Sequence, residues 1–347
     1  MCIRDRLGLT RRLEKALKEA GIPYTIYDKT VANPTTVNVR EALELYHKEG
    51  CDAIIGFGGG SSMDCAKAVG ACAVKPNQSL AQMKGILKVH KKLPLLMAVP
   101  TTAGTGSETT LAAVITDADT RYKYAINDFP LIPRYAVLDP KVTLSLPPFI
   151  TATTGMDALT HAIESYITPG AWAMSDMFEL KAIEMIAANL KAAVDNGNDA
   201  MAREAMSQAQ YIAGMGFSNV GLGIVHSMAH PLGAHYDTPH GVANALLLPY
   251  VMEYNAASPA SPKYIHIAKA MGVNTVGMTE SEGIRAAVDA VRNLSLSIGI
   301  PQKLHEINVR EEDLHQLAID AFNDVCTGGN PRVTSVEDIE ALYRKAF

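Results

Sequence analysis

The pattern of secondary-structure signals changes at Pro147–Pro148, and this change constrains the fold more than any other feature of the sequence. Before the two prolines, short apolar runs such as 52–57 and 93–99 alternate with amphipathic segments. Buried strands joined by helices predict a parallel sheet that is covered on both faces. After the prolines, strand-like runs cease and long helical stretches follow. We therefore expect an α/β, Rossmann-like domain over residues 1–148 and an all-helical domain over residues 149–347.

The expected elements follow from the spacing of apolar residues. Strands are expected at Tyr24–Asp28, Asp52–Phe57, Leu93–Val99, Leu111–Thr116 and Tyr135–Leu138. Helices of the first domain are expected at Thr36–Lys48 and Ser62–Ala73, and Ser61 with Asp64 predicts a capping box for the second of these. The segment Lys75–Lys92 is expected to be a solvated connection. Helices of the second domain are expected at Thr151–Ile167, Ala173–Ala193, Ala202–Gly216, Val242–Tyr254, Ser281–Ile298, Glu311–Asn323 and Ser335–Lys345.

Composition excludes several classes of function. A net charge of -5 over 347 residues leaves no basic footprint for nucleic acid or for an anionic membrane. No apolar run is long enough to span a bilayer, and no secretory segment follows Met1. The five cysteines are odd in number, scattered and without a C-x-x-C pair, which fits a reducing compartment. We therefore expect a cytoplasmic protein, with small neutral or anionic ligands left open.

Two polar loops follow expected strands. The first, GFGGGSSMD at Gly56–Asp64, leads into a helix, so its backbone amides and the helix N-terminus can receive a pyrophosphate. The second, PTTAGTGSE at Pro100–Glu108, also lies at the carboxyl end of a strand, where α/β sheets receive ligands. Strict G-x-G-x-x-G is not met, because Ser61 stands at the sixth position, and a tight turn without a ligand is the alternative. Together the loops favour a dinucleotide cleft.

Four of the ten histidines fall within fifteen residues, at His226, His230, His235 and His240. Imidazole is a frequent ligand for transition metals and the usual proton carrier near neutral pH. A single histidine is more often a capping or core residue than a ligand. Four together, interrupted by prolines and glycines, favour a metal site with a proton relay beside it.

Asp157 and His161 are four residues apart in an expected helix, so both face the same side. A helical Asp–His pair without a metal is the alternative, but the histidine stretch favours a shared site. The predicted ligand set is Asp157, His161, His226 and His240. His230, one helical turn after His226, is expected nearby without coordinating, and His235 is left undecided. Such a set leaves a divalent ion with a charge of about +1, which suits hydride transfer between an alcohol and a carbonyl compound beside a dinucleotide.

These motifs resemble the iron-containing (group III) alcohol dehydrogenases. The resemblance runs from about Ile22 to Phe347 and rests on GGGSSMDCAK, PTTAGTGSE, GMDALTHAIESY and VHSMAHPLGAHYDTPHGVANALLLP. Lactaldehyde reductases are the most similar branch. The resemblance implies Fe(II), with zinc as the alternative, held by the same four residues. It also implies NAD(H) as cofactor and a homodimer or larger homo-oligomer.

The resemblance implies further residue roles. His230 matches a histidine near the nicotinamide and is expected to handle the proton. Phe217 and Cys326 fall where the substrate pocket is expected. Cofactor contacts are expected at Asn33, Gly59, Gly60, Ser61, Asp64, Thr101, Thr102, Thr105, Val114 and Lys123.

The chain departs from the family pattern in two places. A first helix is expected from Leu9 to Ala20, where apolar residues recur at turn spacing before Gly21. Family members carry a further strand–helix unit before this helix, with an acidic residue that contacts the adenosine ribose. We expect that unit to be absent, which leaves NAD against NADP open. Residues 1–6, MCIRDR, resemble a translated sequencing adaptor and are expected to be non-native. Ala112 and Ala113 replace larger residues, so a roomier and less polar pocket is expected.

The expected reaction interconverts a short-chain alcohol or diol and its aldehyde, with 1,2-propanediol and lactaldehyde as the first pair. Dehydrogenation of 1,3-propanediol, methanol or glycerol is the alternative within the family. A lyase of the dehydroquinate synthase type shares the architecture, but the helical domain near the histidines is poor in lysine and arginine. An inactive chain that merely binds metal is the remaining alternative.

Overall fold

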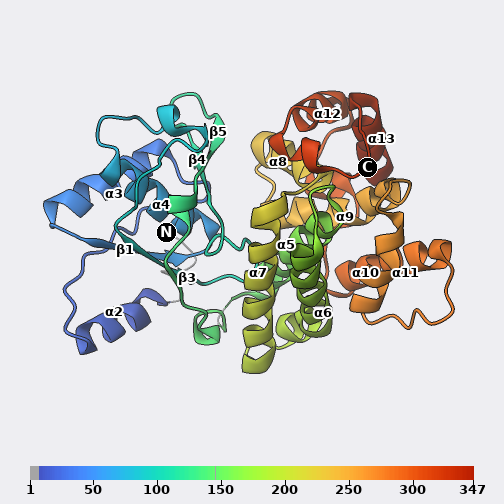
Figure 1. The fold of residues 1–347 in the computed structure, drawn as a ribbon, viewed down its shortest axis with the longest axis horizontal. Coiled ribbons are helices and arrows are strands. Elements are labelled where there is room, and N and C mark those ends of the chain that lie inside the picture. Colours follow the sequence, from blue (N-terminus) through green and yellow to red (C-terminus); the bar gives the residue numbers. More distant parts are fainter. Residues whose placement is uncertain (1–7, 145) are drawn as a thin grey trace. The chain divides into compact units, whose positions relative to one another are not determined.

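The structure, a computed structural model, describes residues 8–144 and 146–347 (Figure 1). The chain divides into two compact units after residue 145, except that Ala103–Thr105 groups with the second unit. The prediction that residues 1–6 are non-native lies outside the described residues. None of the described helices is long and apolar enough to cross a membrane.

A parallel sheet organises the first unit, as the sequence predicts. Its strand order is β1-β3-β6, formed by β1 (Ala53–Gly58), β3 (Leu95–Pro100) and β6 (Tyr135–Ala136). β1 and β3 pair in parallel, with Gly58 opposite Pro100 at their carboxyl ends. Because both strands run in one direction, the two loops that follow them leave the same edge of the sheet.

A second, mixed sheet was only partly predicted. Its order is β2-β5-β4, formed by β2 (Gly85–Ile86), β5 (Lys123–Asn127) and β4 (Ala112–Thr116). The prediction that Lys75–Lys92 is a solvated connection is wrong in part, because Met83 and Val89 are fully buried in the core. The Asp128 carboxylate accepts hydrogen bonds from the backbone N–H groups of Val89 and His90, which fixes this segment to the unit.

The helices of the first unit are α2 (Thr10–Glu19), α3 (Thr36–Lys48) and α4 (Gly60–Val74). The predicted capping box of Ser61 and Asp64 is wrong. α4 begins at Gly60, with Gly59 as its N-cap and no side chain capping it. The Asp64 carboxylate is instead bonded to a neighbouring loop, as described below.

The predicted strand at Tyr24–Asp28 is also wrong. This segment has no regular secondary structure and pairs with no strand among the described residues. Its two tyrosines reach helices instead, since the Tyr24 hydroxyl donates to Glu14 at 3.1 Å and the Tyr27 hydroxyl donates to Glu41 at 2.9 Å. A β-strand needs a partner for its hydrogen bonds, so the apolar alternation here does not produce one.

The second unit is all-helical in its described part, as the sequence predicts. Its α-helices are α5 (Pro148–Ile167), α6 (Ala173–Asp195), α7 (Ala200–Val220), α8 (Ile224–Tyr236), α9 (His240–Asn255), α10 (Tyr264–Ala270), α11 (Glu280–Ser297), α12 (Leu314–Phe322) and α13 (Val336–Ala346). Short 3-10 helices in the two units lie at Ala81–Met83, Phe129–Leu131, Pro140–Val142, Ser261–Lys263, Leu304–Ile307, Glu311–Asp313 and Val325–Gly329. The sequence did not predict α8 or α10.

Candidate metal centre and nucleotide-binding loops

Three acidic or imidazole side chains lie on one face of α5. Asp157, His161 and Glu164 are spaced by four and three residues, which places them on the same side of a helix. All three are buried, because α5 is enclosed by other helices along most of its length. Apolar neighbours therefore surround these polar groups, and each of them needs a partner close by.

The partners come from α8 and α9. Single ligand atoms of Asp157, His161 and His226 all lie within 4.8 Å of one another. The Nε2 atom of His240, the first residue of α9, is 3.6 Å from Oδ1 of Asp157. The structure thus brings together the four residues that the sequence predicts as metal ligands.

α8 brings His226 to this point through a helix rather than through a shaped turn. Pro231 lies inside α8, and the break before α9 is confined to 237–239. Asp237 there has a φ of 53°, a left-handed conformation that reverses the chain. His226 and His240 therefore lie on either side of a turn next to Pro239, whereas Pro231 and Gly233 lie inside α8.

Asn244 on α9 lies at the centre of these side chains. Its Nδ2 donates to Oδ1 of Asp157 at 2.7 Å and contacts Nε2 of both His226 and His240 at 3.1 Å. An amide NH2 group can only donate, and its two hydrogens serve at most two of these three atoms at a time. One carboxylate oxygen and two imidazole nitrogens therefore converge on a single donor group.

Glu164 lies on the far side of His226. One of its oxygens accepts from the Val225 backbone N–H at 2.7 Å, and the other bonds Nδ1 of His226 at 2.5 Å. Burial raises the pKa of Glu164 to about 7, opposed by the N–H groups of Val225 and Gly223. The sequence pattern indicated no role for Glu164 or Asn244, although Glu164 follows His161 by three residues and Asn244 follows His240 by four.

The protonation states suit a divalent transition metal. Burial lowers the pKa of His226 well below its usual range, so its imidazole is neutral and can offer a lone pair. Burial alone would raise the pKa of Asp157, but neighbouring histidines, His161 foremost, hold it below its usual value. Nδ1 of His161 is buried and has no hydrogen-bond partner among the described residues. Imidazole and carboxylate donors of this kind fit Fe(II) or Zn(II).

A second cluster lies next to the centre. The His230 ring stacks on the His240 ring with centroids 5.4 Å apart, and its Nδ1 bonds the Asp324 carboxylate at 2.8 Å. Asp324 also accepts from the backbone N–H of Cys326 at 2.8 Å. His230 is thus oriented from behind by a carboxylate, and no spacing in the sequence indicated Asp324.

Of the remaining predicted site residues of the helical unit, Phe217 and Cys326 lie at the two clusters and His235 does not. The Phe217 ring stacks on the His161 ring at 4.4 Å, so it lies against the centre. Cys326 joins His230 and Asp324 in a group of potential ligand atoms within 4.8 Å of one another. His235 bonds Asp320 at 2.8 Å in an exposed position and takes no part in either cluster.

The first glycine loop opens α4. Gly59 is the N-cap and Gly60 the first helical residue, so free backbone N–H groups are available there for an anion. Oγ of Ser61 accepts from the backbone N–H of Asn33 at 3.2 Å, and Nζ of Lys123 donates to Oδ1 of Asn33 at 3.0 Å. Three segments that are distant in the sequence therefore meet beside this helix N-terminus.

The second loop is fastened to α4 by a buried lysine. Nζ of Lys67 donates to the backbone oxygen of Ser107 at 2.6 Å, to that of Thr110 at 2.9 Å and to that of Ala112 at 2.8 Å. The hydroxyls of Ser107 and Thr110 accept as well. Burial lowers the pKa of Lys67 to about 8, opposed by the nearby carboxylate of Asp64. This ammonium group sets the course of the loop that follows β3.

Other predicted cofactor residues lie in or beside these loops. Asp64 accepts from the Ser107 hydroxyl at 2.8 Å and from the Val114 N–H at 3.1 Å. The Thr101 N–H donates to the Gly58 carbonyl at 2.9 Å, and Thr102 follows it directly. Thr105 belongs to the three-residue segment that groups with the second unit.

Ala113 does not line a pocket. It is fully buried and packs in the core of the first unit beside Tyr124 and Ile126. The expectation that Ala113 enlarges the substrate pocket is therefore wrong, because this residue of β4 faces the inside of the unit.

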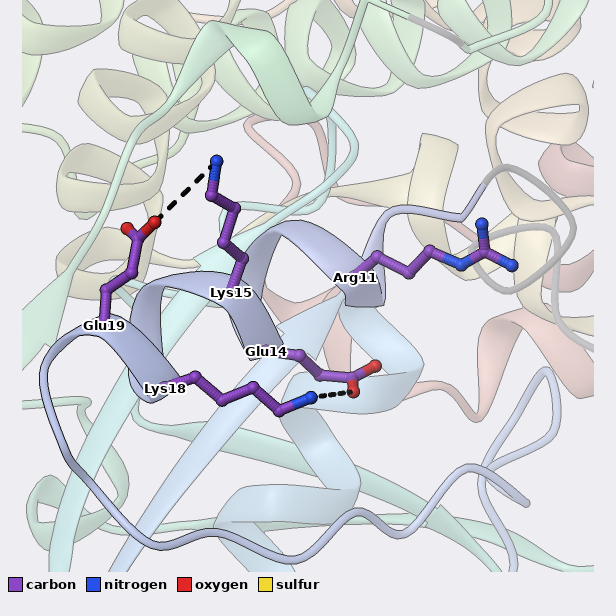
Figure 2. A pocket seen from close by; sticks show the side chains of 5 residues that line it. All are labelled: Arg11, Glu14, Lys15, Lys18 and Glu19. Atoms are coloured by element: carbon purple, nitrogen blue, oxygen red, sulfur yellow. Dashed lines mark ion pairs between the residues drawn. The ribbon is translucent and has the colours of Figure 1, made fainter.

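A shallow surface pocket beside α2 carries no comparable chemistry (Figure 2). It is lined by Arg11, Glu14, Lys15, Lys18 and Glu19. Lys15 pairs with Glu19 at 3.7 Å and Lys18 with Glu14 at 4.0 Å, one helical turn apart (Figure 2). Exposed pairs of this kind contribute little to stability, and we interpret the pocket as a solvated helix face.

The helical unit carries a histidine–carboxylate centre, and the other unit carries glycine-rich loops at the edge of a parallel sheet. These two features together are typical of a metal-dependent, dinucleotide-linked oxidoreductase. Two family models match the sequence: iron-containing alcohol dehydrogenase over residues 2–140, and the C-terminal part of the Fe-containing alcohol dehydrogenase family over residues 151–347. The chain belongs to the iron-containing alcohol dehydrogenase family. Membership confirms the prediction of iron and NAD(H) as cofactors.

Individual relatives agree with this assignment. The chain is 47% identical to lactaldehyde reductase of Escherichia coli (strain K12) over 341 residues, which cover 98% of the chain and 88% of the relative. It is 43% identical to 1,3-propanediol dehydrogenase of Klebsiella pneumoniae over 332 residues, or 95% of the chain and 85% of the relative. The solved alcohol dehydrogenase from Oenococcus oeni is 38% identical, with a TM-score of 0.95, and covers 98% of this chain and 88% of its own.

Proposed function

We propose that the protein interconverts a short-chain alcohol or diol and its aldehyde, with 1,2-propanediol and lactaldehyde as the first candidate pair. The observation that carries the proposal is the convergence of Asp157, His161, His226 and His240 on one point. The 47% identity to a lactaldehyde reductase supports the choice of substrate. We propose these four residues as the metal ligands.

The chain's own residues supply binding, orientation and proton handling. A bound divalent metal supplies Lewis acidity, and NAD(H) supplies the hydride chemistry. His230, oriented by Asp324, is proposed to hold and move the proton at its Nε2 atom. Phe217 and Cys326 are proposed to line the substrate pocket beside the centre. The two loops of the first unit are proposed to hold the cofactor.

The groups around the centre favour this reaction over a lyase. The side chains that contact the four proposed ligands include those of Phe217, His230, Glu164 and Asn244, and none of these four is a lysine or an arginine. A phosphorylated or carboxylated substrate would need several converging basic residues. An uncharged diol or aldehyde needs none, so we propose a small neutral substrate.

The test is a steady-state assay with a panel of short alcohols and aldehydes, together with metal analysis. His226→Ala is expected to lose bound metal and turnover together, because it removes a buried ligand. His235→Ala is the matched control, since His235 lies on the same helix but pairs with Asp320 at the surface. Activity retained in a metal-free His226→Ala protein would rule out the proposal.

The native metal is tested separately. Zinc binds such ligands more tightly than iron(II) by the Irving–Williams order, so affinity alone does not select iron. We expect activity to decay in air and to return when ferrous ion is added without oxygen. An enzyme that is air-stable and active with zinc would contradict the choice of iron.

The proposal includes a homodimeric or larger assembly in the cytoplasm. The four described cysteines, Cys51, Cys65, Cys72 and Cys326, are free thiols, which is compatible with a reducing compartment. Sedimentation velocity on the purified protein measures the assembly, and a monomer at micromolar concentration would contradict it.

A further inference from the structure

Glu164 stands behind the metal centre and touches one of its proposed ligands. It is buried, and its two oxygens serve two different donors. One accepts from the Val225 backbone N–H, and the other bonds Nδ1 of His226. The contact is close because Gly223, the N-cap of α8, leaves room: a Cβ atom there would lie 2.9 Å from Oε1 of Glu164.

Two independent contacts assign the same tautomer to His226. On one side, Nδ1 lies 2.5 Å from an oxygen of Glu164, which as a carboxylate can only accept, so in that form Nδ1 carries the proton and donates it. On the other side, Nε2 lies 3.1 Å from the amide nitrogen of Asn244, which can only donate, so Nε2 carries a lone pair. Glu164 and Asn244 therefore both hold the ring with its free lone pair turned toward Asp157 and His240.

We propose that Glu164 is a positioning residue that holds His226 as the Nδ1–H tautomer and thereby sets the affinity of the centre for its metal. This inference rests on the proposed metal-dependent function. A carboxylate behind a ligating histidine fixes the ring and raises its basicity, and loss of such a partner weakens metal binding on the order of 10- to 100-fold.

The rival role for Glu164 is purely structural. Because it accepts from the N–H of Val225, the second residue of α8, it could serve only to cap that helix. A cap alone predicts that a variant loses stability but keeps the tautomer of His226 and its metal affinity. The two roles therefore differ in a measurable way.

Glu164→Gln separates them. Glutamine has one acceptor oxygen for two donors, and the backbone N–H of Val225 cannot change its role. The amide NH2 is therefore expected to face His226, which forces the ring into the Nε2–H tautomer. That tautomer has no lone pair to offer at the centre.

The experiment uses the full-length protein stripped of metal. Histidine-selective ¹⁵N labelling and long-range ¹H–¹⁵N spectra report the tautomer of His226, with a His226→Ala spectrum for assignment. Titration with Co(II), followed by its visible absorption, reports affinity without any assay of turnover. Glu179→Gln is the matched control, since Glu179 is buried in the same unit but has no hydrogen-bond partner for either oxygen among the described residues.

We expect Nδ1–H in the wild-type protein, Nε2–H in Glu164→Gln, and Co(II) affinity reduced on the order of 10- to 100-fold only in that variant. A wild-type His226 protonated at Nε2 overturns the inference even if Glu164→Gln fails to fold. Unchanged Co(II) affinity in a folded Glu164→Gln protein overturns it as well. Failure of the wild-type protein to bind Co(II) contradicts the proposed function instead.

Discussion

Glu164 and Glu179 are both buried in the helical unit, but they differ in their hydrogen-bond partners. Both oxygens of Glu164 have close hydrogen-bond partners, whereas Glu179 has, among the described residues, only the nearby hydroxyl of Ser165, which donates instead to the His161 backbone oxygen. The backbone of α7 also lies close to Glu179, since a Cβ on Gly216 would be 2.0 Å from its Oε1. Burial raises the pKa of Glu179 well above its usual value, so the folded chain favours the neutral acid.

Glu179→Gln is expected to change how stability depends on pH. Because the pKa of Glu179 is raised in the folded state, its favourable contribution is present below the unfolded value of 4.5 and is lost as pH rises toward the folded value. Glutamine does not ionise, so the variant should gain stability relative to wild type as pH rises. Urea denaturation between about pH 4 and pH 8 measures the difference. The exposed Glu204→Gln is the control, and a pH-independent difference for Glu179→Gln would contradict the assignment.

The residues of the site were predictable to different degrees. The helical period placed Asp157 and His161 on one face, and the density of histidines indicated His226 and His240. The spacing of Glu164 and Asn244 was visible too, but spacing alone does not show which donors will face them. Asp324 contacts His230 from 94 residues away, a pairing that depends on tertiary packing and leaves no local signal.

At the scale of elements, the start of α9 lies close against α5 because Gly241 has no side chain. A Cβ on Gly241 would lie 2.4 Å from the backbone oxygen of Thr153, which cannot move aside as a side chain could. Gly241→Ala is expected to push the two helices apart, cost about 1–3 kcal/mol of stability and move His240 away from Asp157, which weakens metal binding. Thermal denaturation and a Co(II) titration measure both effects.

Gly233→Ala is the matched control. Gly233 lies inside α8, and its added Cβ would meet nothing closer than the Thr238 oxygen at 3.6 Å. Alanine there is expected to stabilise the helix by about 0.5–1 kcal/mol and leave metal affinity unchanged. Equal metal affinity in both variants would show that Gly241 does not set the position of His240.

Prediction of the elements succeeded where burial and periodicity agreed, as in β1, β3 and the long helices. It failed at β5, whose Lys123–Asn127 segment reads KYAIN and lacks a continuous apolar run, because pairing with β4 and not composition makes it a strand. It missed α8, where Pro231 and Gly233 interrupt the helical pattern but lie inside the helix. Tertiary packing overrode local preference in both cases.

At the scale of the whole molecule, the four proposed ligands all belong to the helical unit, and the glycine loop that opens α4 belongs to the other. Metal that binds only the folded state stabilises by about 2.7 kcal/mol at a free concentration of 100 times its Kd. Removal of metal is therefore expected to act on α5, α8 and α9, which carry the ligands, and to leave β1 and α4 unchanged.

Hydrogen exchange with mass spectrometry tests this prediction on wild-type protein with and without a chelator. Exchange that requires the ligand helices to open should accelerate by up to about 100-fold in α8 and α9, which corresponds to 2.7 kcal/mol. The strand and helix around Gly59 should keep their protection, because none of the proposed ligands lies there. His226→Ala is the control, since its exchange should not respond to the chelator. Equal acceleration in both units would mean that the metal stabilises the chain as a single cooperative body, and no change in α8 or α9 would contradict the ligand assignment.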